Sequence, residues 1–488
     1  MRSLVQRLKP LLLAAILAMA LPVAGAHAQT GPANRKPEEE VSRLIAQGNY
    51  PAAERMALAE LKRDASLEGP RSLRAALWYN RLGQVAQLDG RYERALERFR
   101  LSRDIRRDRL GASHGDTLIA QGNMSLVLAR LGRWREAEPM MREVLAGNRR
   151  LLGDGHPRTV TNMTNLGLLS MDLGRQQDAR ALLEEALTLT RKSRQPQSDN
   201  LATALANLAA LYITDMEFAR AEPLLDEALA LDERRHGPDH PALASTLNNL
   251  GQLYHAIGRH ADAARAYQRA LAIDSRHFPP GHALTAGTLA NLAALYRDTG
   301  ELQKARSYLA RALDATARNP AGTDDANAMT LSLIAENLTA DGRHGEAQAL
   351  LWKTISGIEA RLSQGHPATA PLLMQLASTQ FATQSNPKSL AFKAHEIISR
   401  THGIDSAQAA RSALAVTRIL IKSGNLEDAL TWASQARTQI AIHFGTASYD
   451  HAVVQHLYAT ACFGVGRSDD AQVALAPAPG GVLVTGRF

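Results

Sequence analysis

The segment GPDHPALASTLNNLGQLYHAIGRHADAARAYQRALAI (residues 237–273) decides the fold of this chain. Apolar residues recur every three or four positions on both sides of Gly258. They are Leu247, Leu250 and Tyr254 before it, and Ala263, Tyr267 and Ala270 after it. This spacing places apolar side chains on one face of a helix, and glycine adopts the backbone angles of a tight turn. The segment therefore predicts an antiparallel pair of helices.

The same pattern recurs along the chain with a period of 42 residues. The turn positions are Gly48, Gly90, Gly132, Gly174, Met216, Gly258, Gly300, Gly342 and Gln384 and, after a shift of two residues, Gly424 and Gly466. A fixed period in this range indicates a stack of supersecondary units. We therefore expect an all-α solenoid of about eleven repeats over residues 38–476.

A small residue stands five positions after each turn, where it lets two helices approach closely. The series is Ala53, Ala95, Ala137, Ala179, Ala221, Ala263, Ala305, Ala347, Ser389, Ala429 and Ala471. The pattern is irregular near 380–406, where Gln384 replaces the turn glycine and Ser389 replaces the alanine. We interpret this junction as a local bend; a degenerate repeat is the alternative.

The residues of the repeat resemble the tetratricopeptide repeat, which has a large apolar residue, leucine, a small residue and tyrosine before the turn, then alanine and an aromatic residue. That repeat is usually 34 residues long; the eight extra residues here add about one turn to each helix. Segments such as LNNLGQLY (247–254), ANLAALY (206–212 and 290–296) and RAEPLLDEALAL (220–231) are similar to the long repeats of kinesin light chains. The resemblance implies a right-handed superhelical solenoid of antiparallel helix pairs that binds protein or peptide partners.

Residues 1–28 have the features of a signal peptide. A basic start precedes an apolar core at 11–23 and the small-x-small sequence Ala26-His27-Ala28. The apolar run of about 13 residues is shorter than the roughly 20 that a membrane-spanning helix needs. We expect cleavage before Gln29 and a periplasmic or secreted protein with no integral membrane span. A short linker at 29–37 and a flexible tail at 477–488 would flank the repeats.

Five consecutive repeats carry an asparagine nine residues before the turn. These are Asn123, Asn165, Asn207, Asn249 and Asn291, called the asparagine ladder below. Asparagine is a mediocre helix former, so its recurrence indicates a role. In tetratricopeptide domains the first helix of each pair lines the concave groove, and an asparagine there often holds a ligand's backbone or terminal carboxylate. An amide has the donors and the acceptor for this. We expect the ladder to bind a partner; the alternative, which can coexist, is that each asparagine bonds the neighbouring repeat.

A second column stands at the start of the first helices. It comprises His114, His156, Ser198, His240, His282, Asp324, His366, Ser406 and Ser448. Three of its histidines precede proline, which suits the first helical position, and serine and aspartate are common caps. We predict helix caps. Metal binding is excluded by distance, because packed helices lie about 8–10 Å apart and the ligands of one zinc lie about 2 Å from the ion.

Composition and motifs exclude several other functions. The net charge of +8 falls to +5 when the three cations of the signal are removed, and acids and bases alternate along the second helices. Nucleic-acid binding needs a coherent basic stripe, so we expect no nucleic-acid partner. The single cysteine, Cys462, lies on an apolar helix, where we expect it to be buried. No catalytic or phosphate-binding motif is present, so we expect neither an enzyme nor a cofactor.

The sequence thus predicts a non-enzymatic exported adaptor that binds an extended peptide or a partner's tail, in the assembly of an envelope or secretion complex. Two alternatives share the fold: a self-associating structural scaffold, and a regulatory or sensor subunit whose curvature changes on binding. A monomer with a saturable peptide ligand would favour the adaptor. Self-association that depends on concentration would favour the scaffold. The oligomeric state and the partner's identity are not encoded in the repeat pattern.

Overall fold

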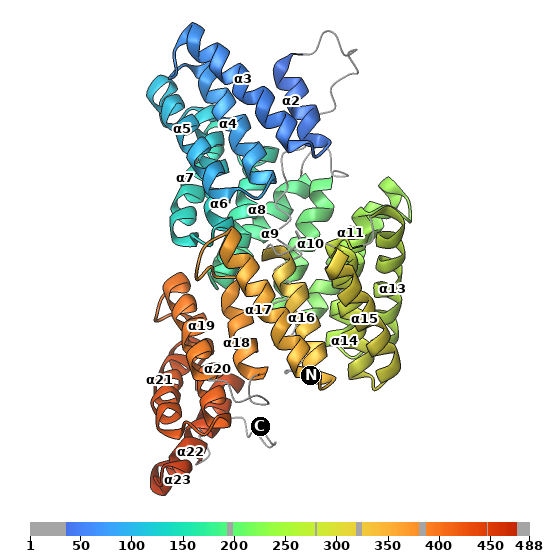
Figure 1. Cartoon of the computed structure of the whole chain (residues 1–488), viewed down its shortest axis with the longest axis vertical. Helices are drawn as coiled ribbons and strands as arrows, with labels where there is room; N and C mark the ends of the chain where they lie inside the picture. Colours follow the sequence, from blue (N-terminus) through green and yellow to red (C-terminus); the bar gives the residue numbers. More distant parts are fainter. Residues whose placement is uncertain are drawn as a thin grey trace. The chain divides into compact units, whose positions relative to one another are not determined.

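The computed structural model describes residues 36–192, 199–278, 281–318, 325–379, 387–446 and 448–475. These residues form consecutive helix pairs, which confirms the predicted all-α solenoid class (Figure 1). The chain divides into two compact units between Leu231 and Asp232. The predicted signal peptide, nearly all of the linker and the tail lie outside the described residues.

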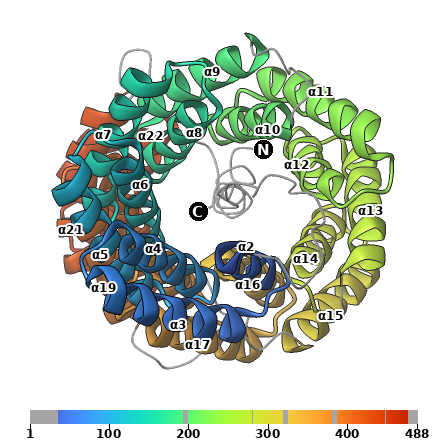
Figure 2. The same cartoon turned by 90° about the horizontal axis from the view of Figure 1, so that it is seen from above.

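In the unit that ends at Leu231, even-numbered helices are the first members of the pairs and odd-numbered helices the second. The first helices are α2 (Pro37–Ala46), α4 (Leu73–Leu88), α6 (Gly115–Arg130), α8 (Pro157–Asp172) and α10 (Asp199–Thr214). The second helices are α3 (Tyr50–Glu68), α5 (Tyr92–Leu110), α7 (Trp134–Leu152), α9 (Gln176–Lys192) and α11 (Phe218–His236), within which the unit boundary falls. Within this unit the first helices form the inner layer and the second helices the outer layer (Figure 2).

The unit that begins at Asp232 repeats this arrangement. Its first helices are α12 (Ala242–Ala256), α14 (Ala283–Asp298), α16 (Asp325–Ala340), α18 (Thr369–Thr379), α20 (Ala407–Lys422) and α22 (Tyr449–Gly464). Its second helices are α13 (His260–His277), α15 (Leu302–Arg318), α17 (His344–Arg361), α19 (Pro387–His402), α21 (Leu426–Phe444) and α23 (Ser468–Leu475). First helices of neighbouring repeats also touch, as α14 does α16 and α20 does α22.

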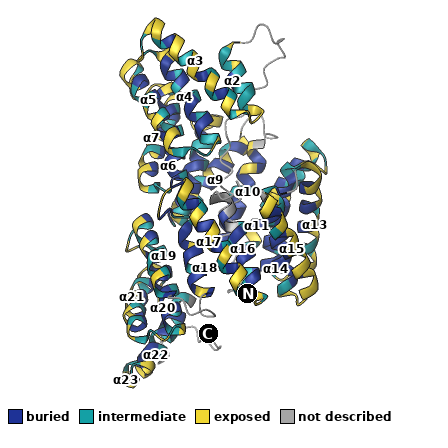
Figure 3. Ribbon diagram, viewed as in Figure 1, coloured by how far each residue is buried: buried dark blue, intermediate teal, exposed yellow. Residues whose placement is uncertain are grey.

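Apolar side chains between the two layers form the core, seen as the buried faces in Figure 3. Every described alanine of the predicted column is buried, and Tyr267 is fully buried. A Cβ atom added to Gly251 would lie 2.5 Å from the Tyr267 ring, so only glycine allows α12 and α13 to approach this closely. Cys462 is buried as predicted.

The turns have the predicted backbone. Gly258 has a φ of 81°, and the other described turn glycines are also in the left-handed region. Met216 adopts the same conformation with a φ of 62°, the only such value among the described residues other than glycine. A Cβ atom makes this conformation unfavourable, so the repeat geometry holds Met216 in a strained backbone.

The irregular junction differs from its prediction in register. Ser389 is exposed, whereas Pro387, two residues earlier, is buried at the start of α19. Pro387 therefore takes the position of the column alanine, and the shift of two residues precedes α19. Proline is compatible with this position because the first helical turn needs no N–H from it. The predicted turn residue Gln384 lies outside the described residues.

Candidate functional site

The asparagine ladder lies on the first helices of five repeats: α6, α8 and α10 in one unit, and α12 and α14 in the other. Asn165, Asn249 and Asn291 are only 7%, 5% and 7% exposed, whereas Asn123 and Asn207 are half-buried. The ladder side chains are thus largely enclosed between neighbouring helices. Their contacts with other repeats decide what remains available to a partner.

Two members of the ladder bond the preceding repeat. Nδ2 of Asn123 donates to Oδ1 of Asn80 at 3.1 Å, and Nδ2 of Asn291 donates to Oδ1 of Asn248 at 3.5 Å. Gln375, at the same position of a later repeat, donates from Nε2 to the Ser332 carbonyl at 2.9 Å. All three bonds join residues that are 43 positions apart. For these residues the structure shows the stacking interaction.

The other members have different neighbours in the sequence. Asn165 follows Gly122 by 43 residues, and Asn249 likewise follows Ala206; neither glycine nor alanine has a side chain that accepts a hydrogen bond. Asn207 follows Thr164, whose hydroxyl donates to the Val160 carbonyl and forms no bond with Asn207. Oδ1 of Asn249 is buried without a hydrogen-bond partner among the described residues. A buried acceptor without a partner costs about 1–3 kcal/mol. Partner binding by the ladder stays a prediction, with Asn165, Asn207 and Asn249 as its strongest candidates.

Small uncharged residues accompany the ladder. Four residues before a ladder asparagine stand Thr161, Thr203, Ser245 and Gly287, all at least partly accessible to solvent. Positions four apart lie on one face of a helix. Each of these repeats therefore presents an amide beside a small neutral residue, an arrangement that lets another backbone approach closely and form hydrogen bonds.

The cap prediction is confirmed for His114, His156, His282, Ser406 and Ser448. His240 and His366 stand before the cap position, because α12 begins at Ala242 and α18 at Thr369. Nδ1 of His114 accepts a hydrogen bond from the Asp116 backbone N–H at 3.2 Å, and His156, His240, His282 and His366 act in the same way. Ser406 and Ser448 accept from the backbone N–H three residues later. Ser198 and Asp324 lie outside the described residues.

A column of buried polar residues on the second helices was not predicted from the sequence. Sixteen residues after successive turns stand Asp64, Arg106, Asn148, Thr190, Asp232 and Asp274, each at most 8% exposed. The same 42-residue period would have revealed them.

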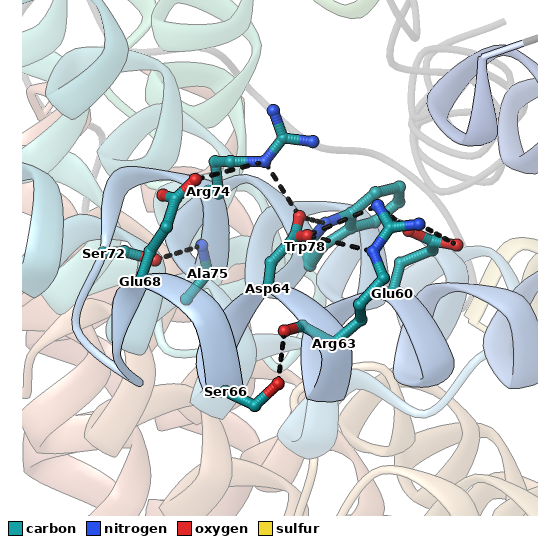
Figure 4. Close-up of polar contacts among 9 residues, drawn as sticks. All are labelled: Glu60, Arg63, Asp64, Ser66, Glu68, Ser72, Arg74, Ala75 and Trp78. Carbon is teal, nitrogen blue, oxygen red and sulfur yellow. Dashed lines mark hydrogen bonds and ion pairs between the residues drawn. The ribbon is translucent and has the colours of Figure 1, made fainter.

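Two carboxylates of this column contact the next first helix. Oδ2 of Asp64 accepts hydrogen bonds from Nε1 of Trp78 at 2.8 Å and Nε of Arg74 at 3.0 Å (Figure 4). Burial alone raises the pKa of Asp64, but these donors lower it below its ordinary value. Among the described residues, only the Thr288 hydroxyl donates to Asp274, at 3.2 Å, so burial dominates and raises the pKa of Asp274 to about 6.

Ion pairs link the outer helices. Arg149 contacts Glu185 at 2.6 Å, and Arg269 contacts Glu233 at 2.6 Å, in each case across neighbouring repeats. The alternating charges of the second helices therefore pair between helices as well as along them. Such exposed pairs each contribute about 0–1 kcal/mol.

Comparison with known proteins identifies the repeat. The family model described as tetratricopeptide repeat matches residues 44–108, 116–192, 199–276 and 284–360, more than half of the chain. The chain belongs to the tetratricopeptide repeat family. No curated protein matches this tetratricopeptide repeat protein.

Two solved structures are similar to this tetratricopeptide repeat protein. One is BtubC (BKLC) from P. vanneervenii, with 28% identity over 46% of this chain and 89% of the other, and a TM-score of 0.39. The second is a Podosopora anserina protein described as a kinesin light chain with nearly identical TPR-like repeats. It has 22% identity over 43% of this chain and 98% of its own, with a TM-score of 0.38.

The family assigns this tetratricopeptide repeat protein a general role. Its repeats indicate an adaptor for protein–protein interaction. In the described part of the chain, no helix has the length and apolar character to cross a membrane, and no cluster of side chains has the composition of a metal site.

Proposed function

We propose that this protein is an exported, non-enzymatic adaptor that binds an extended peptide or a partner's tail, in the assembly of an envelope or secretion complex. Recognition of the peptide backbone takes place on the inner layer, where ladder amides stand beside small residues. One observation carries the proposal: Asn207 on this layer is half-buried, and no hydrogen bond joins its amide, which includes an acceptor oxygen, to another described residue. A backbone N–H of a bound chain would satisfy such an acceptor.

The same arrangement recurs in α8 and α10. Asn165 stands with Thr161, and Asn207 with Thr203. Neighbouring repeats lie about 10 Å apart, and an extended chain advances about 3.3 Å per residue. Two adjacent repeats therefore match about three residues of a bound peptide. Because amides read the backbone rather than side chains, we expect broad sequence tolerance.

A peptide-display experiment tests this proposal. A random 12-residue library is selected on the mature protein, and the affinity of a selected peptide is measured by fluorescence anisotropy. The double variant Asn165→Ala/Asn207→Ala should lose at least tenfold in affinity, since each lost hydrogen bond contributes about 1 kcal/mol, while its melting temperature barely changes. Asn123→Ala is the matched control: it removes the bond to Asn80 and should lower stability more than affinity. The reverse pattern would contradict the proposal.

Export is tested separately. Protein purified from the producing cells should begin at Gln29, because the basic start, short apolar core and Ala26-His27-Ala28 fit a cleaved signal. A retained Met1 on membrane-bound protein would contradict export. Sedimentation velocity over a wide concentration range should show one monomeric species. Concentration-dependent growth without a peptide ligand would favour the scaffold.

A further inference from the structure

A cavity of about 260 Å³ lies near the N-terminal end of the described chain, lined by residues of α2, α4, α5 and α6. Leu77 and Trp78 contribute apolar walls. An apolar cavity of about 150 Å³ is enough to bind benzene, and pockets for drug-sized ligands begin at about 300 Å³. The cavity therefore has the volume for a molecule of roughly amino-acid size. It is formed by other residues than the asparagine ladder.

Two opposite charges line this cavity without pairing. Glu38 of α2 is half-buried, and no ion pair joins its carboxylate to another described residue. Arg106 of α5 is 8% exposed and has no carboxylate partner among the described residues. Its Nη1 donates one hydrogen bond, to the Asp116 carbonyl at 2.9 Å. A guanidinium has five donors, so most of the hydrogen-bonding capacity of Arg106 is available.

Burial of Arg106 destabilises the folded protein. Burial lowers the pKa of Arg106, which reflects the loss of hydration around its charge. Arg81 on α4 is half-buried and increases the local positive potential, because it also lowers the pKa of Arg106. The Asp116 carboxylate raises the pKa of Arg106 but does not overcome the effect of burial, and a buried charge that is only partly compensated destabilises a protein. A ligand carboxylate beside Arg106 would offset this cost.

The remaining charges of the wall are already paired or hydrated. Nε of Arg74 lies 3.0 Å from Oδ2 of Asp64, the same oxygen that accepts from Nε1 of Trp78 (Figure 4). These contacts fix the Trp78 ring as a rigid wall. Asp116 is exposed and contributes negative charge at the rim. The lining charges that form no ion pair with a described residue are therefore Glu38 and Arg106, although Glu38 also attracts Arg74 and Arg81 at longer range.

We propose that this cavity binds a small zwitterion with an apolar side chain, of the class of a free apolar α-amino acid. The ligand carboxylate pairs with Arg106, the ammonium pairs with Glu38, and the side chain lies against Leu77 and Trp78. A simple anion would leave Glu38 unpaired and meet its repulsion. A simple cation would leave Arg106 unpaired. Only a molecule with both charges and an apolar part pairs with Glu38 and Arg106 and also packs against the apolar walls.

Calorimetric titration of the purified protein tests this with named probes. L-Leucine, L-methionine and L-phenylalanine are titrated, each beside its N-acetyl derivative, which lacks the ammonium, and its amide, which lacks the carboxylate. We expect at least one free amino acid to bind in a saturable manner, and both of its derivatives to bind at least tenfold more weakly. Absence of heat with all three amino acids at millimolar concentration would overturn the proposal. Equal binding of the derivatives would also overturn it.

Variants locate the site. Glu38→Gln and Arg106→Gln should each weaken binding at least tenfold. The matched controls are Glu39→Gln and Arg107→Gln, because both residues are exposed neighbours on the same helices and do not line the cavity. They should bind like the unmodified protein. If Arg106→Gln fails to fold, the affinity of Glu38→Gln alone decides whether this cavity is the binding site. Binding unchanged in Glu38→Gln, or weakened equally in Glu39→Gln, would refute this site.

Discussion

Nε2 of His255 in α12 lies 3.3 Å from Oδ2 of Asp298 in α14. The two residues are 43 positions apart (298 − 255 = 43), the same separation as in the bonds of Asn123 to Asn80 and Asn291 to Asn248. A separation of 43 residues thus recurs among the polar contacts between neighbouring first helices, beside others such as Arg297 to Asn337, which are 40 positions apart. Because such contacts are enclosed, their effect on stability should be measurable.

Asp298→Asn should destabilise the protein. Burial alone raises the pKa of Asp298, but His255 and Arg297 overcome it and lower the value to about 2. A depressed pKa means that the carboxylate stabilises the fold above its ordinary pKa of about 4 and loses this effect as the pH falls towards 2. At 1.36 kcal/mol per unit, the loss at pH 7 is about 2 kcal/mol. Urea denaturation at pH 7 and pH 3 measures it, and the difference from the unmodified protein should shrink at pH 3.

The control is Asp314→Asn, since Asp314 forms an exposed pair with Arg318. It should change the free energy of unfolding by less than about 0.5 kcal/mol. If both variants lose the same amount of stability, the contact with His255 has no special effect.

Asp274→Asn should stabilise the protein, in contrast to Asp298→Asn. Asp274 is fully buried, and its pKa is raised to about 6. A raised pKa destabilises the fold progressively as the pH rises from about 4 to 6, and fully above that. Asparagine removes the charge and fits the column, because Asn148 occupies the equivalent position. We expect a gain of up to about 3 kcal/mol at pH 7 and little change at pH 4, measured by urea denaturation. A loss of stability at pH 7 would show that the ionised form is needed.

A double-mutant cycle on Asn123 and Asn80 should reveal coupling. Nδ2 of Asn123 donates to Oδ1 of Asn80, so each single alanine variant breaks the same bond. The coupling free energy should be about 0.5–1.5 kcal/mol. Thermal unfolding of the two single variants and the double variant measures it. Strict additivity would mean that this hydrogen bond contributes nothing to repeat stacking.

Met216→Gly should stabilise the turn. Met216 has a φ of 62°, a conformation that costs about 1–2 kcal/mol for a residue with a Cβ atom. Part of the gain is offset because glycine has more freedom in the unfolded chain, so the net increase should be up to about 1 kcal/mol. Gly258→Ala is the converse control and should lose about 1 kcal/mol. A Cβ atom at Gly258 meets no atom within 4 Å, so this loss reports the backbone alone. Melting temperatures of both variants test the pair.

The helix pairs could be predicted because their determinants are local. Glycine at a tight turn and alanine at a helix contact depend on a few neighbouring residues, so one repeat sufficed to recognise the others. At Met216 the turn forms without glycine, because the surrounding helices impose the left-handed backbone conformation. The register of the irregular junction was predicted wrongly because Ser389 and Pro387 are both compatible with the pattern, and only packing distinguishes them.

The site was predicted less completely, because it depends on which columns face each other. The sequence showed that Asn123 recurs with the period, but not that its amide meets Asn80 one repeat and one residue earlier. Buried polar residues such as Asp274 could not be predicted from the apolar periodicity, which marks the packed faces of the helices and not the polar residues enclosed between them.

The recurring separation of about one repeat between contacting first helices also bears on how the chain folds. Contacts between neighbouring first helices close loops of about one repeat, with separations from 39 to 47 residues, so the entropy cost of closure does not increase along the array. Contact order therefore stays low for a protein of 488 residues. Assembly can begin at whichever pair of repeats is most stable and extend outward one repeat at a time. Gene duplication or deletion can add or remove a whole repeat. The contacts between neighbouring first helices would then form again between the same positions of the repeat.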